Sequence, residues 1–269
     1  MDPRAPFTLV HLSDLHVRSD TDKASGHTGA LSLAGLKAMA LVAHVQHEHP
    51  DAHVVITGDV TDSGTATSYA VAKRILKPWL DPTRLSVVPG NHDCGTWGRT
   101  FMPDRRSHFR STFTPTQPAS SPGFPFLKMV GPLAILGLDS NVKASGEPLA
   151  RGHLGEVQLA RLDALLARLP ADRVPVILLH HHPYDHEPTA ELEDAAALRE
   201  CLTHRLGKRP SLVLFGHRHF STTRTQHWPA YYQAPSSVIV EKGRLRYRLF
   251  TITPDRIRDD WVTCPLPTG

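Results

Sequence analysis

The sequence predicts a single α/β domain in which central β-sheets are covered by helices. Along most of the chain, short apolar runs rich in β-branched residues alternate with longer amphipathic segments, an order typical of α/β folds. The final part is rich in strand-forming residues, and no linker or internal repeat divides the 269 residues. That length fits one large domain, so we expect residues 1–269 to fold as one unit.

Each expected strand is a short apolar run that stops at a turn-forming residue. The strands are predicted at residues 7–12, 53–57, 84–88, 126–130, 133–138, 174–179 and 212–215. The two runs on either side of Gly131-Pro132 are expected to form a hairpin. The C-terminal part, residues 229–263, is expected to form several antiparallel strands.

Apolar residues at helical spacing predict four helices between these strands. They are expected at residues 31–47, 68–80, 154–169 and 192–206. The first ends before Pro50, because proline disrupts the helical hydrogen-bond pattern. Residues 94–125 have weak periodicity and many Pro, Ser, Thr and Arg residues, which indicates an irregular insertion or a lid with a short helix.

The composition is that of a soluble globular protein, with 40% hydrophobic and 21% charged residues. No apolar run approaches the roughly 20 residues that cross a bilayer, and the amino terminus lacks the pattern of a secretory signal. We therefore expect a cytoplasmic protein without a membrane partner. The three cysteines are too few and too widely spaced for a disulfide framework. The net charge of +4 favours anionic partners only in general.

Five apolar strand runs are each followed at once by a polar cluster. The clusters are Asp14-Leu15-His16, Gly58-Asp59, Gly90-Asn91-His92-Asp93, His180-His181-His182-Pro183 and Gly216-His217-Arg218-His219. In α/β sheets, ligands bind outside the carboxyl ends of the strands, so the five clusters are expected to meet at one site.

The residue types in these clusters indicate a metal centre. Carboxylate, amide and imidazole groups suit Mn, Fe, Zn and similar divalent ions. The D-x-H and H-x-H spacings put both side chains on the same side of an extended segment. Each cluster alone has an ordinary interpretation as a turn or a solvated hairpin. Five in succession, each at a strand end, favour the metal site.

The order of these motifs resembles that of the calcineurin-like metallophosphoesterase superfamily over about residues 7–220. The motifs are D-x-H, G-D, G-N-H-D, H-x-P and G-H-x-H. The surrounding sequences TGDVTDSG, VVPGNHD and LVLFGHRH are most similar to its class III cyclic-nucleotide phosphodiesterase branch. The resemblance implies a four-layer αββα sandwich, in which two mixed β-sheets are flanked by helices. It also implies two divalent metal ions, with Mn or Fe expected and Zn compatible with the same donors.

The resemblance also implies the ligands. One metal is expected on Asp14, His16, Asp59 and His219, and the other on Asp59, Asn91, His181 and His217, with Asp59 bridging the two. His181 is selected from the three histidines because the family's ligand lies two residues before the proline, here Pro183.

The implied reaction is hydrolysis of a small-molecule phosphodiester, with a cyclic nucleotide as one candidate, by attack of metal-bound hydroxide at phosphorus. The resemblance implies that His92 faces the leaving group, where it is expected to protonate the leaving oxygen or to stabilise the charge of the transition state. Asp93 is expected either to orient His92 or to cap a helix, and the sequence does not separate these roles.

The substrate residues are the least determined by the sequence. Arg99, Tyr184 and His182 are candidates. Arg105, Arg106 and Arg110 lie in the same stretch as Arg99 and could also reach a phosphate, although a basic surface lid explains all four arginines more readily. The same metal site would serve a phosphomonoesterase or a pyrophosphohydrolase acting on nucleotides or sugar phosphates. A nuclease is disfavoured because little chain follows the last motif, and a non-catalytic scaffold because all ligand positions are filled. A homodimer is expected from related diesterases.

Overall fold

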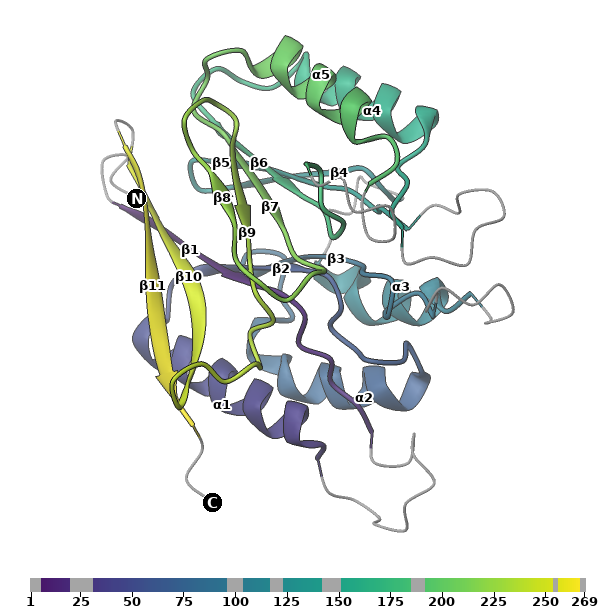
Figure 1. Cartoon of the computed structure of the whole chain (residues 1–269), viewed down its shortest axis with the longest axis vertical. Coiled ribbons are helices and arrows are strands. Elements are labelled where there is room, and N and C mark those ends of the chain that lie inside the picture. Colours follow the sequence, from purple (N-terminus) through teal and green to yellow (C-terminus); the bar gives the residue numbers. More distant parts are fainter. Residues whose placement is uncertain are drawn as a thin grey trace.

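The computed structural model describes residues 6–19, 31–95, 104–116, 123–141, 151–184, 192–253 and 256–266. Two β-sheets face each other in the middle of the molecule, with helices on both outer sides (Figure 1). The strand order is β11-β10-β1-β2-β3 in the first sheet and β4-β5-β6-β7-β9-β8 in the second. Both sheets are mixed, so the predicted αββα sandwich is confirmed.

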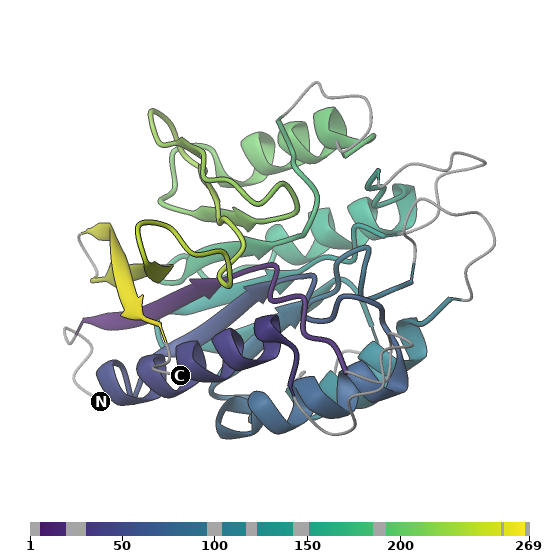
Figure 2. The ribbon, with the colours of Figure 1, turned by 60° about the horizontal axis from the view of Figure 1, so that its bottom comes forward.

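The first sheet combines three parallel strands with an antiparallel hairpin. Its strands are β1 (Phe7–Leu12), β2 (His53–Thr57), β3 (Leu85–Val88), β10 (Arg244–Ile252) and β11 (Ile257–Pro265). β1 pairs parallel with β2 and antiparallel with β10. The outer face is covered by α1 (Leu33–Glu48), α2 (Ala66–Ile75) and α3 (Arg106–Phe113). Figure 2 shows α1 and α2 running beneath this sheet.

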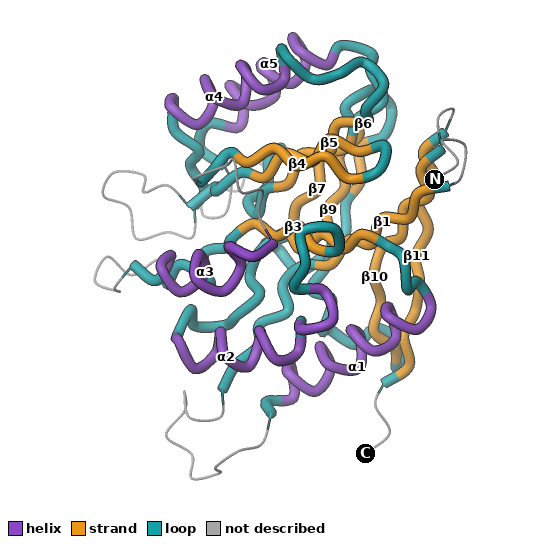
Figure 3. The backbone as a smooth tube through the Cα atoms, turned by 180° about the vertical axis from the view of Figure 1, so that it is seen from behind, coloured by secondary structure: helices purple, strands orange, loops and turns teal. Residues whose placement is uncertain are grey.

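The second sheet is built around four parallel strands, β5, β6, β7 and β9, which continue the α/β pattern. Its strands are β4 (Phe126–Val130), β5 (Leu133–Gly137), β6 (Val174–Leu178), β7 (Leu212–Phe215), β8 (Thr223–Arg224) and β9 (Ala230–Gln233). α4 (Glu156–Leu166) and α5 (Ala195–Leu206) cover its outer face (Figure 3). β4 and β5 form the predicted hairpin.

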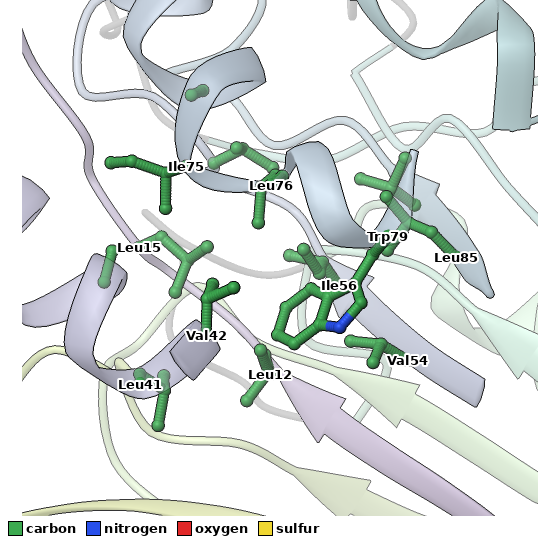
Figure 4. Close-up of a cluster of buried hydrophobic side chains, with 14 of the residues drawn as sticks. Leu12, Leu15, Leu41, Val42, Val54, Ile56, Ile75, Leu76, Trp79 and Leu85 are labelled. Atoms are coloured by element: carbon green, nitrogen blue, oxygen red, sulfur yellow. The ribbon is translucent and has the colours of Figure 1, made fainter. Parts of the chain in front are cut away.

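Three apolar clusters hold the four layers together, one between the sheets and one under each helical layer. Along β1, Leu9 joins the cluster between the sheets, whereas Val10 and Leu12 join the cluster under α1 and α2. This alternation is the ordinary pleat of a strand. Figure 4 shows the second of these clusters, where the fully buried indole of Trp79 lies over Ile56 and Val54.

Some boundaries differ from the expected ones. The helix predicted at 68–80 is divided: α2 ends at Ile75, and a short 3₁₀ turn, η2 (Lys77–Trp79), follows. Pro78 explains the break, because its nitrogen has no hydrogen to donate. The stretch 94–125 contains α3 and the turn η3 (Thr114–Thr116), while its residues 96–103 and 117–122 lie outside the described ones.

The strands of the C-terminal part are not all antiparallel, as the sequence had led us to expect. β10 and β11 do form an antiparallel hairpin, but β9 pairs parallel with β7 and extends the second sheet. None of the helices in the described ranges is long and apolar enough to cross a bilayer.

Candidate metal centre

The polar clusters that follow β1, β2, β3, β6 and β7 meet at the carboxyl ends of these strands, as predicted. Contacts between them join the two sheets. The backbone N–H of His217 after β7 donates to Asp14 Oδ2 after β1 (3.2 Å). The backbone N–H of Asp14 in turn donates to the carbonyl of Gly58 after β2 (3.0 Å).

The first group of side chains brings together Asp14, His16 and His219. His219 Nε2 lies 3.3 Å from Asp14 Oδ1, and His16 Nε2 lies 3.9 Å from the same oxygen. The two Nε2 atoms are 2.9 Å apart. Asp14 is fully buried, and its Oδ1 accepts no hydrogen bond from the described residues. Three donor atoms therefore converge on one point.

The second group contains Asp59, His180 and His217, with Asn91 beside them. His180 Nε2 lies 3.2 Å from Asp59 Oδ2, 3.1 Å from Asn91 Oδ1 and 3.1 Å from His217 Nδ1. Asp59 Oδ2 is also 3.9 Å from His16 Nε2, so its carboxylate lies between the two groups. Burial alone would raise the pKa of Asp59, but the surrounding imidazoles, first that of His180, hold it well below its usual range.

The structure thus places His180 in the position for which the sequence suggested His181. Leu178 belongs to the core between the sheets and Leu179 to the core under α4 and α5. Alternation then directs His180 towards the first sheet, where its Nδ1 lies 2.7 Å from the carbonyl of Thr57. The Nδ1 of His181 instead contacts Ser140 Oγ (2.7 Å) after β5.

Ser140 is a supporting residue that the sequence analysis did not identify. Besides contacting His181, its hydroxyl oxygen accepts long hydrogen bonds from the backbone N–H groups of His180 (3.4 Å) and His181 (3.3 Å). Its position directly after a strand in the segment LGLDSN would have been the signal.

The donor set fits divalent cations. Imidazole nitrogens that face one another at about 3 Å beside buried carboxylates need a proton or a metal ion between them, and His with Asp and Asn is the donor chemistry of Mn, Fe and Zn sites. Three groups of side chains each have their possible ligand atoms within 4.8 Å of one another. The groups are Asp14, His16 and His219; His16, Asp59 and His92; and Asp59, His180 and His217.

Five of these side chains sit on left-handed backbone. The φ angles are 53° at Asp14, 44° at His16, 50° at Asp59, 77° at His217 and 57° at His219. Residues with a Cβ seldom adopt this conformation, which costs on the order of 1 kcal/mol each. Such outliers cluster at functional sites, where the surrounding fold imposes them.

His92 points at this centre from the turn after β3. Its Nε2 lies 4.0 Å from Asp59 Oδ2, and its Nδ1 lies 2.9 Å from the carbonyl oxygen of Asp62 and 3.6 Å from the carboxylate of that residue. Burial would lower the pKa of His92, but the carboxylates of Asp59 and Asp62 outweigh it and raise the pKa to about 9. Asp62, which the sequence analysis missed although it lies in the same TGDVTDSG segment, therefore orients His92.

Asp93 has neither of the two roles considered from the sequence. Its buried carboxylate accepts hydrogen bonds from the backbone N–H groups of Val60 (3.0 Å), Thr61 (2.8 Å) and Gly90 (3.1 Å) and from the Thr61 hydroxyl (3.0 Å). It does not bond to His92, and no helix begins there. Asp93 ties the turn carrying Asp59 to the turn that follows β3.

Two of the three suggested substrate residues, His182 and Tyr184, pack against residues outside the ligand groups. Arg99 lies outside the described residues. The His182 ring packs against Phe215 (centroids 4.8 Å apart) in the core under α4 and α5, and burial lowers its pKa to about 4. Tyr184 has the guanidinium groups of Arg199 and Arg224 over its ring, 5.1 and 4.4 Å from the centroid.

Two arginines of the basic stretch have structural partners. Arg105 donates to the carbonyl of Ser63, and Arg106 to the carbonyl of Asn141. They attach the start of α3 to the loops that carry Ser63 and Asn141, contacts that the basic-surface interpretation did not include.

Comparison with known proteins agrees with the geometry. A probable cyclic nucleotide phosphodiesterase of Rhodococcus erythropolis is 30% identical over 231 residues, covering 83% of this chain and 68% of the relative. A cAMP/cGMP dual specificity phosphodiesterase of Mycobacterium tuberculosis is 29% identical over 231 residues, covering 83% and 65%. The chain thus spans about two thirds of the length of these relatives.

The fold has been seen in solved structures. A dimetal phosphatase from Danio rerio superposes with a TM-score of 0.69 over 97% of this chain and 100% of that chain, at 16% identity. The family model described as calcineurin-like phosphoesterase matches residues 7–221, which include every cluster of the centre. The chain therefore belongs to the calcineurin-like phosphoesterase family.

Proposed function

We propose that this phosphoesterase is a two-metal phosphodiesterase that hydrolyses small cyclic-nucleotide-like diesters. The observation that carries the proposal is the pair of adjoining donor groups on either side of Asp59, with His92 aimed at the same carboxylate. The relatives named as cyclic nucleotide phosphodiesterases support the choice of substrate class.

We assign Asp14, His16, Asp59 and His219 to one metal, and Asp59, Asn91, His180 and His217 to the other. His180 replaces His181 because its Nε2 is the atom beside Asp59, Asn91 and His217. Two divalent ions held by these residues would lower the pKa of a water and neutralise phosphate oxygens, and Mn, Fe and Zn all suit the donors.

The chain's own residues supply positioning and a proton. Asp62 fixes the Nδ1 side of His92, which leaves Nε2 directed at the centre. The Asp62 carboxylate, 3.6 Å from Nδ1, favours the protonated form of the imidazole. In this position His92 can donate that proton to the leaving oxygen or stabilise negative charge on it. Asp93 keeps the two turns at their spacing.

The assignment of ligands is tested by comparing His180→Ala with His181→Ala. Removing a ligand should reduce the bound manganese by about one ion per chain and lower hydrolysis of bis-p-nitrophenyl phosphate at least about 100-fold. We expect this of His180→Ala, whereas His181→Ala should keep its metal content. The opposite pattern in elemental analysis would overturn the assignment.

The reaction is tested with manganese-loaded protein on paired substrates. We expect faster hydrolysis of bis-p-nitrophenyl phosphate than of p-nitrophenyl phosphate, and turnover of 3′,5′-cyclic AMP or GMP. A clear preference for the monoester would show a phosphomonoesterase instead. No hydrolysis of any of these esters by protein with a full metal content would refute the catalytic proposal.

A further inference from the structure

A second hollow lies outside the metal centre, between the β8–β9 edge of the second sheet and the β10–β11 hairpin. Its volume is about 480 Å³, within the range of about 300–1,000 Å³ that small-molecule sites occupy. The lining residues are Ser221, Thr222, Thr223, Thr225, Tyr232, Arg248, Asp259, Asp260 and Trp261. None of these residues belongs to the proposed ligand groups.

Arg248 forms a rigid, nearly buried part of this pocket, with only 3% of it exposed. It donates to Asp259 and to Ser221 Oγ (3.1 Å), and its guanidinium lies over the rings of Trp261 (4.2 Å) and Tyr232 (5.0 Å). A guanidinium has five N–H groups, and in Arg248 only two of them donate to acceptors within the described chain. Its Nε is buried, so the donors that it offers to the oxygen atoms of a ligand are the remaining N–H groups of the two terminal nitrogens.

The charge of the lining favours a neutral ligand. Asp259 neutralises Arg248 and also accepts a hydrogen bond from the Tyr232 hydroxyl (3.2 Å). Asp260 adds a second carboxylate to the lining. This side chain is more than half exposed, and its Oδ2 lies 3.9 Å from Arg258 Nη2. The guanidinium of Arg258 beside Asp260 and that of Arg246 over the Trp261 ring bring the charges around the pocket close to balance, so neither an anion nor a cation is strongly favoured. Exposed carboxylates instead accept hydrogen bonds from neutral hydroxyl groups.

The remaining wall offers hydroxyls and one aromatic surface. The hydroxyls of Thr223 and Thr225 make no hydrogen bond within the described chain, and each can both donate and accept. The guanidinium groups of Arg246 (4.6 Å) and Arg248 (4.2 Å) lie over the Trp261 ring, and the residue is still 37% exposed, so the uncovered part of its indole can pack against an apolar face. We propose that this pocket binds a neutral, hydroxyl-rich ring, the chemistry shared by a free sugar and the ribose of a nucleoside.

The pocket is connected to the metal centre by short segments. Ser221 lies two residues after His219. On the other side, Arg248 pairs in register with His11, three residues before Asp14, which is a separation of roughly 10 Å along the strand. The ligand would thus bind beside the centre without using its donors, and the proposal does not depend on the proposed function.

The test measures binding to the metal-loaded full chain by calorimetry and saturation-transfer NMR. The probes are D-glucose and D-ribose as sugars, adenosine and guanosine as nucleosides, and D-glucuronate as an anionic counterpart of glucose. Trp261→Leu and Thr223→Val alter the pocket. Trp228→Leu is the matched control, because that indole is 36% exposed but does not line the pocket. Asn91→Ala alters the metal centre instead.

We expect at least one neutral probe to bind, with an affinity reduced at least tenfold in both pocket variants. The affinity should stay within twofold in Trp228→Leu and Asn91→Ala, and glucuronate should bind no more tightly than glucose. Binding by sugars or only by nucleosides distinguishes the two sources. The proposal is overturned if no neutral probe binds, if binding survives both pocket changes, if Asn91→Ala abolishes it, or if glucuronate binds more tightly than glucose.

Discussion

Replacing Asp93 with asparagine tests whether this residue holds the two turns together. The carboxylate accepts from Val60 and Gly90 at Oδ2, and from the backbone and hydroxyl of Thr61 at Oδ1. Asparagine offers only one oxygen, so its amide group must face at least one backbone N–H. An unsatisfied buried N–H costs about 1–3 kcal/mol, and the other three bonds lose charge assistance worth about 1 kcal/mol each.

The expected loss in the free energy of unfolding is therefore about 4–6 kcal/mol, a large part of the roughly 5–15 kcal/mol of a typical domain. Urea denaturation of the metal-free protein at neutral pH measures it, with the exposed Asp260→Asn as a control expected within about 0.5 kcal/mol. A variant of normal stability and metal content but low kcat would refute this reasoning. That pattern would instead support the orientation of His92 by Asp93.

Three further changes test other parts of the structure. Gly90→Ala would place a Cβ 2.1 Å from Asp59 Oδ1, so we expect loss of bound metal by elemental analysis and at least a 100-fold loss of activity. Burial lowers the pKa of His53 to about 4, so below about pH 6.5 the unfolded chain takes up a proton that the folded chain does not. The free energy of unfolding should therefore fall by about 2 kcal/mol between pH 7 and pH 5. Urea titrations of His53→Gln should lack this part of the loss. Tyr184→Leu should change KM less than about threefold in a steady-state assay, because two guanidinium groups already lie over the ring.

The position of the centre could be predicted from the sequence because the sequence shows where each strand ends. Each polar cluster directly follows an apolar run, and the carboxyl ends of neighbouring parallel strands meet at one edge. The choice of His180 was also within reach. Counting back from Pro183 led to His181. Leu178 and Leu179 instead point into different cores, and continuing this alternation directs His180 towards the first sheet, as the structure shows.

The supporting carboxylates could not be assigned in the same way. Asp62 and Asp93 act from irregular turns, where the periodicity of a strand no longer fixes the direction of a side chain. Asp93 is adjacent to His92 in sequence, which suggested a contact, yet its oxygens bond to Val60, Thr61 and Gly90. The orienting role belongs to Asp62, 30 residues earlier. Contacts of this kind depend on how two turns stack, which only the folded structure shows.

The glycines of the motifs show a constraint that connects both sheets. Gly90 and Gly216 are not in the left-handed region, so conformational freedom does not explain them. A Cβ at Gly216 would lie 1.9 Å from Ser13 Oγ and 2.5 Å from Asp14 Oδ2, and one at Gly90 would lie 2.1 Å from Asp59 Oδ1. Both glycines thus permit a backbone from one strand end to touch a carboxylate from another. The proposed ligands themselves have the positive φ angles, so the backbone strain lies at the residues whose side chains must point at the centre. The glycines allow the close packing that holds these side chains in place.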